Sequence, residues 1–241
     1  MEKLIEMLQN SKYCIALTGA GISTLSGIRD FRGKNGIYKD FDANIIFDIN
    51  YFQKDPTLYY ETTKDIIYSL DKKKPGIVHT ELTRLENLGI VKNIITQNID
   101  LLHAKAGSTN VIELHGSPRT HHCMDCGQIF QYEYIASIVN SGMVPWCDLC
   151  HGIIKPDIVF YGELLEPDKL DAAIAEASKA DLIMALGTSL LVQPAASLPL
   201  YTIEHGSLVI VNDMPTPLDE IADLHYSELE VVFRMIHEFI M

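Results

Sequence analysis

The chain is poor in basic residues and has no long apolar run. Its 19 lysines and arginines are outnumbered by 32 aspartates and glutamates, which leaves a formal net charge of −13 at pH 7. General nucleic-acid binding needs a basic face, so no nucleic-acid partner is expected. The longest apolar stretch, Leu182–Val192, is interrupted by Gly187-Thr188-Ser189 and is too short to cross a bilayer, so no membrane partner is expected either.

The N-terminus lacks the basic start and apolar core of an export signal. Residues 1–12 instead place Leu4, Ile5 and Leu8 at helical intervals, which predicts a surface helix. Cysteine is also scarce, because the 241 residues include only five. Cys14 stands alone in an apolar run, where a buried and inert thiol is the ordinary interpretation.

The other four cysteines form two C-x2-C pairs, Cys123 with Cys126 and Cys147 with Cys150. Four thiolates at this spacing can surround Zn²⁺ tetrahedrally and leave no open position for water or substrate. We therefore predict a structural zinc ion, with four buried, metal-free cysteines as the alternative. Reduced thiols, a metal site and no export signal together predict a cytoplasmic protein.

Short apolar runs alternate with helical patterns along most of the chain, which is typical of an α/β fold built on a parallel sheet. Strands are predicted at Tyr13–Thr18, Asn93–Thr96, Val111–Leu114, Leu182–Leu186 and Leu208–Val211, and covering helices at Leu82–Leu88 and Lys169–Ala177. Polar motifs follow these strands, and ligands of open α/β sheets bind beyond the carboxyl ends of the strands. The pattern therefore predicts a ligand crevice at that edge of the sheet.

Two segments interrupt this alternation. Residues 33–74, which are rich in aromatic side chains, are expected to form a loop followed by helices, and residues 118–154 contain the four cysteines. We interpret both as insertions into one Rossmann-like core of approximately residues 1–32, 75–117 and 155–241. The helical insertion and the zinc ribbon would then form a smaller domain within a single catalytic unit.

Gly19-Ala20-Gly21 follows the first predicted strand and would let the backbone approach phosphates. The third glycine of a dinucleotide fingerprint is missing, and no acidic residue follows at the spacing typical of dehydrogenases, which disfavours a Rossmann oxidoreductase. In the nearby run Asp30-Phe31-Arg32-Gly33, Arg32 could clamp a pyrophosphate and Phe31 could cover a flat ring. A surface charge and an ordinary core ring are the alternatives.

Further motifs complete an ordered pattern. They comprise Gly19–Ser23, Ser26–Ile28, Asp30–Gly33, Thr96–Asp100, Leu102-His103, Ala106-Gly107, Glu113–Gly116, the four cysteines, Tyr161–Glu163, Gly187–Leu190, Val192, Pro194-Ala195 and Val211-Asn212. In this combination the chain resembles the sirtuin (Sir2) family of NAD-dependent protein deacylases. The resemblance covers essentially the whole chain, as expected for a near-minimal, bacterial-type catalytic core.

The resemblance implies transfer of an acyl group from lysine to the ADP-ribose part of NAD, with release of nicotinamide. In this family a histidine acts as general base on a ribose hydroxyl, and His115 occupies that position. An ordinary histidine pKa of about 6.5 suits this role, although a histidine at a strand end is more often a structural hydrogen-bonding residue. Asn98 would order the ribose and nearby water as a second catalytic residue.

By the same resemblance, three segments would contact NAD. They are Gly19, Ala20, Gly21, Ser23, Asp30, Phe31 and Arg32 after the first strand, Gln97, Asn98, Ile99 and Asp100 after the second, and Gly187, Thr188, Ser189, Asn212 and Asp213 at the adenosine half. Gln97 would contact ribose hydroxyls, whereas Ile99 and Asp100 would line the nicotinamide pocket. Simple polar turns are the alternative for individual members of this set.

Acyl-lysine proteins are the partners that the resemblance implies. The segment Ile158–Glu163 would lie along the peptide in strand-like fashion, with His115, Val159, Phe160, Tyr161 and Gly162 as substrate-binding residues, whereas a plain strand and turn is the alternative. No arginine stands three residues after Tyr59 or Tyr60, as it does in sirtuins that prefer succinyl-like groups. We therefore expect uncharged acyl groups, acetyl first.

The resemblance leaves open the behaviour of the loop at Arg29 and the choice among three related functions. Arg29 stands where the family more commonly has proline, so the behaviour of the adjacent loop is not fixed by the resemblance. A protein mono-ADP-ribosyltransferase would use the same activated ribose, and a non-catalytic, NAD-sensing zinc-ribbon module would need no base. His115 favours deacylation over both, and the sequence leaves the oligomeric state undetermined.

Overall fold

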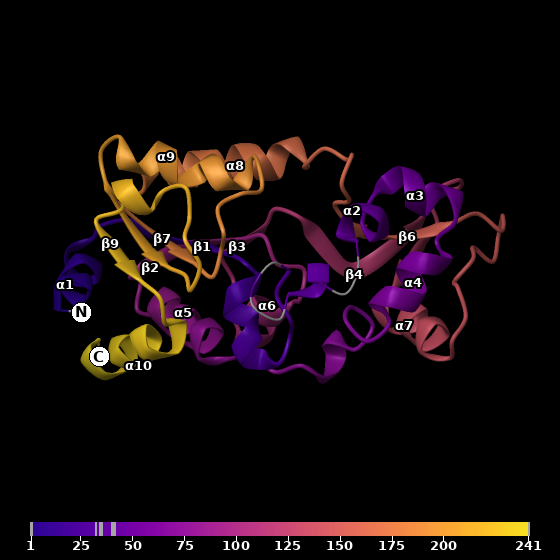
Figure 1. Ribbon diagram of the computed structural model, residues 1–241, viewed down its shortest axis with the longest axis horizontal. Helices are drawn as coiled ribbons and strands as arrows, with labels where there is room; N and C mark the ends of the chain where they lie inside the picture. Colours follow the sequence, from indigo (N-terminus) through magenta and orange to yellow (C-terminus); the bar gives the residue numbers. More distant parts are fainter. Residues whose placement is uncertain (1, 32, 34–35, 40–41, 241) are drawn as a thin grey trace.

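The computed structural model describes residues 2–31, 33, 36–39 and 42–240, and its main sheet has six parallel strands (Figure 1). Their order is β3-β2-β1-β7-β8-β9. The strands are β1 (Cys14–Thr18), β2 (Val91–Thr96), β3 (Val111–Glu113), β7 (Leu182–Leu186), β8 (Ser207–Val211) and β9 (Leu224–Tyr226). The chain moves outward from β1 to β3 and later resumes on the other side of β1. The boundary between β1 and β7 is therefore the switch point at which a doubly wound sheet binds ligands.

Helices cover both faces of this sheet, as Figure 1 shows. One face packs against α1 (Glu2–Asn10), α5 (Ile77–Asn87) and α10 (Leu229–Phe239), and the other against α8 (Pro167–Lys179) and α9 (Leu198–Ile203). The short helix α6 (Leu102–Ala106) follows the end of β2. Because both faces are covered, β1 and β7 are buried at every position, which explains their continuous apolar sequences.

A second, three-stranded sheet lies at the other end of the molecule (Figure 1). Its order is β5-β4-β6, formed by β4 (Gly116–Cys123), β5 (Ile129–Gln131) and β6 (Ile154–Ile158), all antiparallel. Around it stand α2 (Ala43–Ile46), α3 (Ile49–Lys54), α4 (Thr57–Thr63) and α7 (Tyr132–Asn140). One buried cluster joins these helices to the sheet, and Phe52, Tyr59 and Phe160 pack their rings together at its centre.

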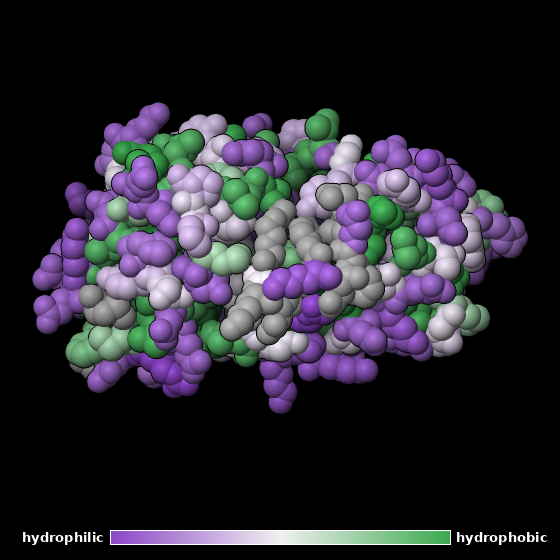
Figure 2. All heavy atoms as spheres, viewed as in Figure 1, coloured by the Kyte–Doolittle hydropathy of each residue, from purple (hydrophilic) through white to green (hydrophobic). Residues whose placement is uncertain are grey.

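Short 3-10 helices occupy five connections, at Ala20–Ser26, Ile37–Lys39, Leu70–Lys72, Ala195–Ser197 and Asp219–Ile221. In the described part of the chain, no helix is both long and apolar enough to span a membrane. Figure 2 shows hydrophilic side chains spread over both ends of the face in view.

The five predicted strands and two predicted helices are confirmed, with boundaries that differ by a few residues. The predicted N-terminal surface helix is α1, and the aromatic insertion does lead into helices. Around the main sheet, the sequence reasoning missed α6, α9, β9 and α10. β9 has only three residues, all at least partly exposed, so it carries no apolar run that could reveal it.

The carboxyl ends of β1 and β7 approach so closely that they exclude side chains. A Cβ on Gly19 would lie 2.7 Å from the carbonyl oxygen of Gly187. A Cβ on Gly21 would lie 2.8 Å from the Cα of Gly187. The Gly21 amide donates to the same carbonyl at 2.9 Å. Gly187 itself has φ +58°, and its own Cβ would meet the amide nitrogen of Ile22 at 2.5 Å. Glycine is therefore required here for both conformation and space.

We predict that Gly187→Ala lowers the free energy of unfolding by roughly 2–5 kcal/mol, because strain at positive φ adds to overpacking. Thermal denaturation without ligands measures this loss. Gly142→Ala is the matched control, because Gly142 also has positive φ (+86°) but nothing lies within 4 Å of an added Cβ. The control should lose only about 1–2 kcal/mol. Equal losses in the two variants would show that the close approach contributes nothing.

Candidate active site

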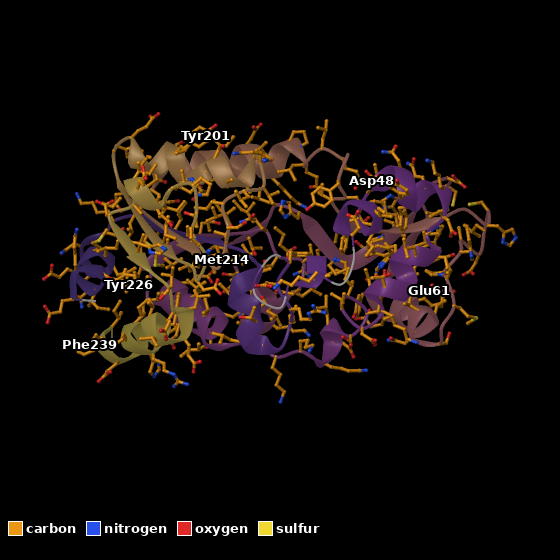
Figure 3. All side chains as sticks on the ribbon, viewed as in Figure 1. Asp48, Glu61, Tyr201, Met214, Tyr226 and Phe239 are labelled. Atoms are coloured by element: carbon orange, nitrogen blue, oxygen red, sulfur yellow. The ribbon has the colours of Figure 1, made fainter. Side chains whose placement is uncertain are left out.

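A cavity of about 650 Å³ opens where the strands of the main sheet end. Its walls include Gly19, Ala20, Gly21, Asp30 and Phe31, Gln97, Asn98 and Ile99, His115, Val159, Phe160, Tyr161 and Gly162, and Gly187, Thr188, Ser189, Asn212 and Asp213. Met214, labelled in Figure 3, lies at the same cavity near the middle of the molecule. Most of the residues predicted from the sequence therefore surround one space.

Two of the described predicted residues stand apart from this wall. Ser23 and Asp100 line a smaller, adjoining cavity of about 40 Å³, which shares Ala20, Asn98 and Ile99, among others, with the larger one. Arg32, predicted to clamp a pyrophosphate, lies outside the described residues. The two cavities thus share part of their walls, and we call the smaller one the recess.

Asn98 is held in place by a buried polar network at the ends of β1 and β2. Its side-chain amide donates to the carbonyl oxygen of Gly19 at 3.1 Å and to Ser23 Oγ at 3.3 Å. Its backbone amide donates to Thr96 Oγ1 at 3.0 Å, and Thr18 Oγ1 donates to the same hydroxyl at 2.9 Å. Asn98 is 7% exposed, so these bonds replace most of its hydration.

The recess also contains a carboxylate whose two oxygens both accept hydrogen bonds from the chain. Asp100 Oδ2 accepts from Ser23 Oγ at 2.5 Å, and Asp100 Oδ1 accepts from the Leu102 amide at 2.9 Å. The second bond satisfies an amide in the first turn of α6. Asp100 therefore shapes the recess and begins the helix that follows it.

His115 follows β3 and immediately precedes Gly116, where β4 begins. Its Nδ1 lies 2.8 Å from the carbonyl oxygen of Gln97, which can only accept, so Nδ1 carries the proton. Nε2 of the neutral ring is then a proton acceptor. Burial lowers the pKa of His115 below its ordinary value, while the Gln97 carbonyl raises it in part. A neutral imidazole at the wall of this cavity is suited to general-base chemistry.

The substrate segment predicted from the sequence is anchored at both ends. The Val159 amide donates to the carbonyl oxygen of His115 at 2.9 Å. The Tyr161 amide donates to the Phe47 carbonyl at 2.7 Å, and the Tyr161 carbonyl accepts from Ile49 at 3.1 Å. Figure 3 labels Asp48, which forms the parallel bridge with Tyr161. Because both backbone groups of Tyr161 are hydrogen-bonded within the chain, strand-like pairing with a peptide has to use the backbone of other residues.

The cavity wall opposite the histidine is formed by the ends of β7 and β8. Thr188 Oγ1 accepts from Gln97 Nε2 at 2.9 Å, which fixes the Gln97 side chain across the switch point. Asn212 Nδ2 donates to the Met214 carbonyl at 2.7 Å, and its backbone amide donates to Tyr226. Sequence reasoning missed further lining residues, namely Phe47, Leu164, Leu165, Pro167, Leu170, Asp171, Gln193 and Met214. These carry no local motif, because long-range packing brings them to the cavity.

The four paired cysteines converge at one point. Their Sγ atoms lie within 4.8 Å of one another, with Cys123 and Cys150 at 3.4 Å and Cys126 and Cys147 at 3.6 Å. Tetrahedral Zn–S bonds of about 2.3 Å place sulfurs roughly 3.8 Å apart, so the donor set and spacing fit zinc. Among the described residues, no histidine or carboxylate joins this cluster. The site is closed and lies apart from the cavity wall, as a structural metal requires.

Comparison with known proteins agrees with this geometry. Residues 19–194 match the Sir2 family. The NAD-dependent protein deacetylase of Thermotoga maritima is 46% identical over 228 residues, which cover 94% of this chain and 92% of that protein. A solved Sir2 structure with a deacetylated peptide and 3′-O-acetyl ADP ribose has a TM-score of 0.94 at 44% identity, covering 99% of this chain and 98% of that one. Another, bound to a propionylated peptide, has a TM-score of 0.90 at 42% identity, with 99% and 97% covered.

The fold and the cavity together define a nucleotide-binding α/β protein of the Rossmann type, with a four-cysteine ribbon beside it. The chain belongs to the Sir2 family.

Cys123→Ala should release zinc and unfold the small sheet, because structural zinc contributes about 10–16 kcal/mol in zinc-finger peptides. Metal analysis of the purified protein, together with circular dichroism, measures both effects. Cys14→Ala is the control, because this thiol is buried in β1, away from the cluster, and should leave the zinc content unchanged. A zinc-free Cys123→Ala protein that stays folded would show that the metal does not hold this sheet together.

Proposed function

We propose that this protein is an NAD-dependent protein-lysine deacylase that transfers the acyl group to ADP-ribose and releases nicotinamide. The observation that carries the proposal is His115, a half-buried imidazole whose Nδ1 proton is committed to the Gln97 carbonyl and whose ring lines the large cavity. The Thermotoga maritima relative, named an NAD-dependent protein deacetylase, supports the same activity. Acyl-lysine proteins are the substrates of this reaction.

The residues at the strand ends fit NAD. Gly19, Gly21 and Gly187 leave backbone surface without side chains, which allows the close approach that a pyrophosphate needs. Ser189, Asn212 and Asp213 hold the adenosine half, and Gln97 faces the ribose. Asp30 and Phe31 cover the cofactor from the segment after β1, and the sequence-based assignment of Arg32 to the pyrophosphate is part of the same proposal. Bound NAD supplies the activated ribose that receives the acyl group.

The recess next to Asn98 takes the nicotinamide group, with Ile99 and Asp100 in its wall. The backbone amide and the side-chain amide of Asn98 are both hydrogen-bonded within the chain, so the residue is held in place. From this fixed position Asn98 orders the ribose and a water molecule. His115 removes the proton from a ribose hydroxyl through Nε2. Mono-ADP-ribosyl transfer would not need this base, and a non-catalytic NAD sensor would not need it either. Deacylation therefore accounts for more of the site.

The acyl-lysine enters along Val159 and the wall formed by Phe160, Tyr161 and Gly162. Among the described residues that line the large cavity there is no lysine or arginine. A charged acyl group would lose its hydration there without a counter-ion, which costs several kcal/mol. Uncharged groups, acetyl first, are the substrates, and the solved Sir2 structure with a propionylated peptide supports acceptance of a slightly longer chain.

The proposed domain division groups the packed clusters on the two faces of the main sheet and separates them from the one at the small sheet. One catalytic unit contains a Rossmann-like core of approximately residues 1–32, 75–117 and 155–241, with insertions 33–74 and 118–154 forming the small domain. The shared aromatic cluster of the two insertions supports this division. Reduced thiols and structural zinc support a cytoplasmic location.

Mass spectrometry of an acetyl-lysine peptide, incubated with the protein with and without NAD, tests the proposed function. Loss of the acetyl group only with NAD, together with nicotinamide and O-acetyl-ADP-ribose, is the expected result. Nicotinamide release from a peptide that stays acetylated would point to ADP-ribosyl transfer or NAD hydrolysis instead. No consumption of NAD with any of several acyl chains would overturn the enzyme assignment.

His115→Ala should fold normally yet lose deacylation by about two orders of magnitude or more, the scale of lost acid–base catalysis. Circular dichroism checks the fold, and the peptide assay measures the rate. His205→Ala serves as the control, because this exposed histidine follows α9 and does not line the cavity. Activity retained in His115→Ala would remove His115 as the base.

The pH dependence of kcat/KM should show a loss of activity on the acid side with a midpoint below pH 6.5, because burial lowers the pKa of His115 from that ordinary value. The base works in its neutral form, so the rate is constant above this midpoint and falls as the ring is protonated below it. A peptide without other groups that titrate between pH 5 and 7 isolates the effect. A midpoint at or above pH 6.5 would contradict the assignment.

A further inference from the structure

Lys155 is a buried cation that the proposed chemistry leaves unexplained. It lies in β6, directly before the segment that forms the peptide side of the cavity, and it is only 3% exposed. Burying an ammonium group is costly unless it is fully paired and hydrogen-bonded. The contacts of Lys155 therefore indicate which structural role offsets the cost of burying its charge.

The ammonium has three oxygen partners, two through hydrogen bonds and one through an ion pair. Lys155 Nζ donates to the carbonyl oxygen of Ile158 at 2.7 Å and to that of Pro156 at 3.2 Å. It lies 2.9 Å from Glu163 Oε2, which completes an ion pair. The charge also stands over the face of the Phe160 ring, 4.5 Å from its centre. Each of these partners belongs to residues 156–163, so one side chain holds the whole segment.

Glu163 adds further hydrogen bonds at the end of the segment 156–163. The same Oε2 atom accepts from the Phe160 amide at 2.7 Å, and the Glu163 amide donates to the Phe160 carbonyl at 3.0 Å. Gly162 within this turn has φ +91°, as the third residue of a type II turn requires. The carboxylate therefore links the Lys155 ammonium to a tight turn that presents Tyr161 and Gly162 to the cavity.

An apolar side chain would fill the same space without the desolvation cost, because buried ion pairs are often replaceable without loss of stability. An apolar side chain could not hold the Pro156 and Ile158 carbonyls and the Glu163 carboxylate around a single group, as the ammonium does. The flanking anchors are His115, which accepts from Val159, and Phe47, which accepts from Tyr161. Lys155 holds the backbone just before those anchors through the Pro156 and Ile158 carbonyls. It acts on the backbone between them through Glu163, which accepts from the Phe160 amide.

We propose that Lys155 is a positioning residue for the acyl-lysine peptide: its ammonium, through Ile158, Glu163 and Phe160, sets the geometry of the cavity wall along which the peptide binds. This inference rests on the proposed deacylase function. Lys155 touches neither the reacting atoms nor the glycine segments, so its effect is confined to the peptide side of the site.

Lys155→Met tests this, because methionine keeps an unbranched chain and removes all three donors. The KM for an acetyl-lysine peptide should rise roughly tenfold or more, since small displacements of a binding wall have effects of this size. The KM for NAD should stay within about twofold, because the strand-end glycines are untouched. A merely structural role would instead lower the melting temperature and raise both constants together.

Lys105→Met is the matched control. Its ammonium also donates to three backbone carbonyls, those of Leu70 at 2.6 Å, Asp71 at 3.2 Å and Lys73 at 3.3 Å, but none of these lies on the peptide wall. This variant should leave the peptide KM unchanged. An unchanged peptide KM in folded Lys155→Met, or a parallel rise of both constants, would overturn the proposal.

If Lys155→Met does not fold, Lys155→Gln gives the same test, because it keeps two N–H donors without the charge. A smaller rise of the peptide KM is then expected, and no rise would overturn the proposal. Binding of a fluorescent acetyl-lysine peptide separates this inference from the proposed function. Failure of the unaltered protein to turn over the peptide refutes the deacylase, whereas equal peptide binding by the unaltered protein and Lys155→Met refutes the positioning role.

Discussion

The approach of β1 to β7 at their carboxyl ends is the constraint on which the cavity depends. These strands pair in register from Cys14 with Leu182 to Thr18 with Leu186, and the chain then turns away on both sides. Side chains at Gly19, Gly21 or Gly187 would collide with the backbone of the facing turn. Their absence leaves bare backbone at the switch point, and a 3-10 helix rather than a full α-helix follows it.

A second requirement is that buried polar groups near this gap find partners within the protein. Asn98 and Asp100 are 7% and 6% exposed. The chain supplies carbonyl and hydroxyl partners for Asn98, and hydroxyl and amide partners for Asp100. The same low dielectric that strengthens these bonds makes each one costly to break. The network therefore holds the recess in one shape before any ligand arrives, and that preorganisation lowers the cost of binding.

Much of this could be predicted from the sequence, because the strands of a covered parallel sheet are continuous apolar runs and their polar ends follow directly. The metal site could be predicted as well, because the local spacing of the two cysteine pairs alone indicates a shared metal ion. What could not be predicted arises from contacts that no local sequence pattern indicates. Tyr161 pairs with Phe47 and Ile49, and Lys155 reaches Glu163, although neither partnership has a periodic signal. The short strand β9 left no apolar run, and the placing of Asp100 in a separate recess depends on packing.

His115 joins the two sides of the site, and this explains why its environment has two opposing effects on the ring. Its Nδ1 proton is held by Gln97, on the segment that we assign to the nucleotide, and its own carbonyl holds Val159, on the segment that we assign to the peptide. Burial lowers the pKa of the imidazole, and the Gln97 carbonyl opposes that shift. A base that was simply buried would be neutral but weak. The carbonyl fixes the tautomer and preserves part of the basicity, so one hydrogen bond both orients the proposed base and keeps it able to accept a proton.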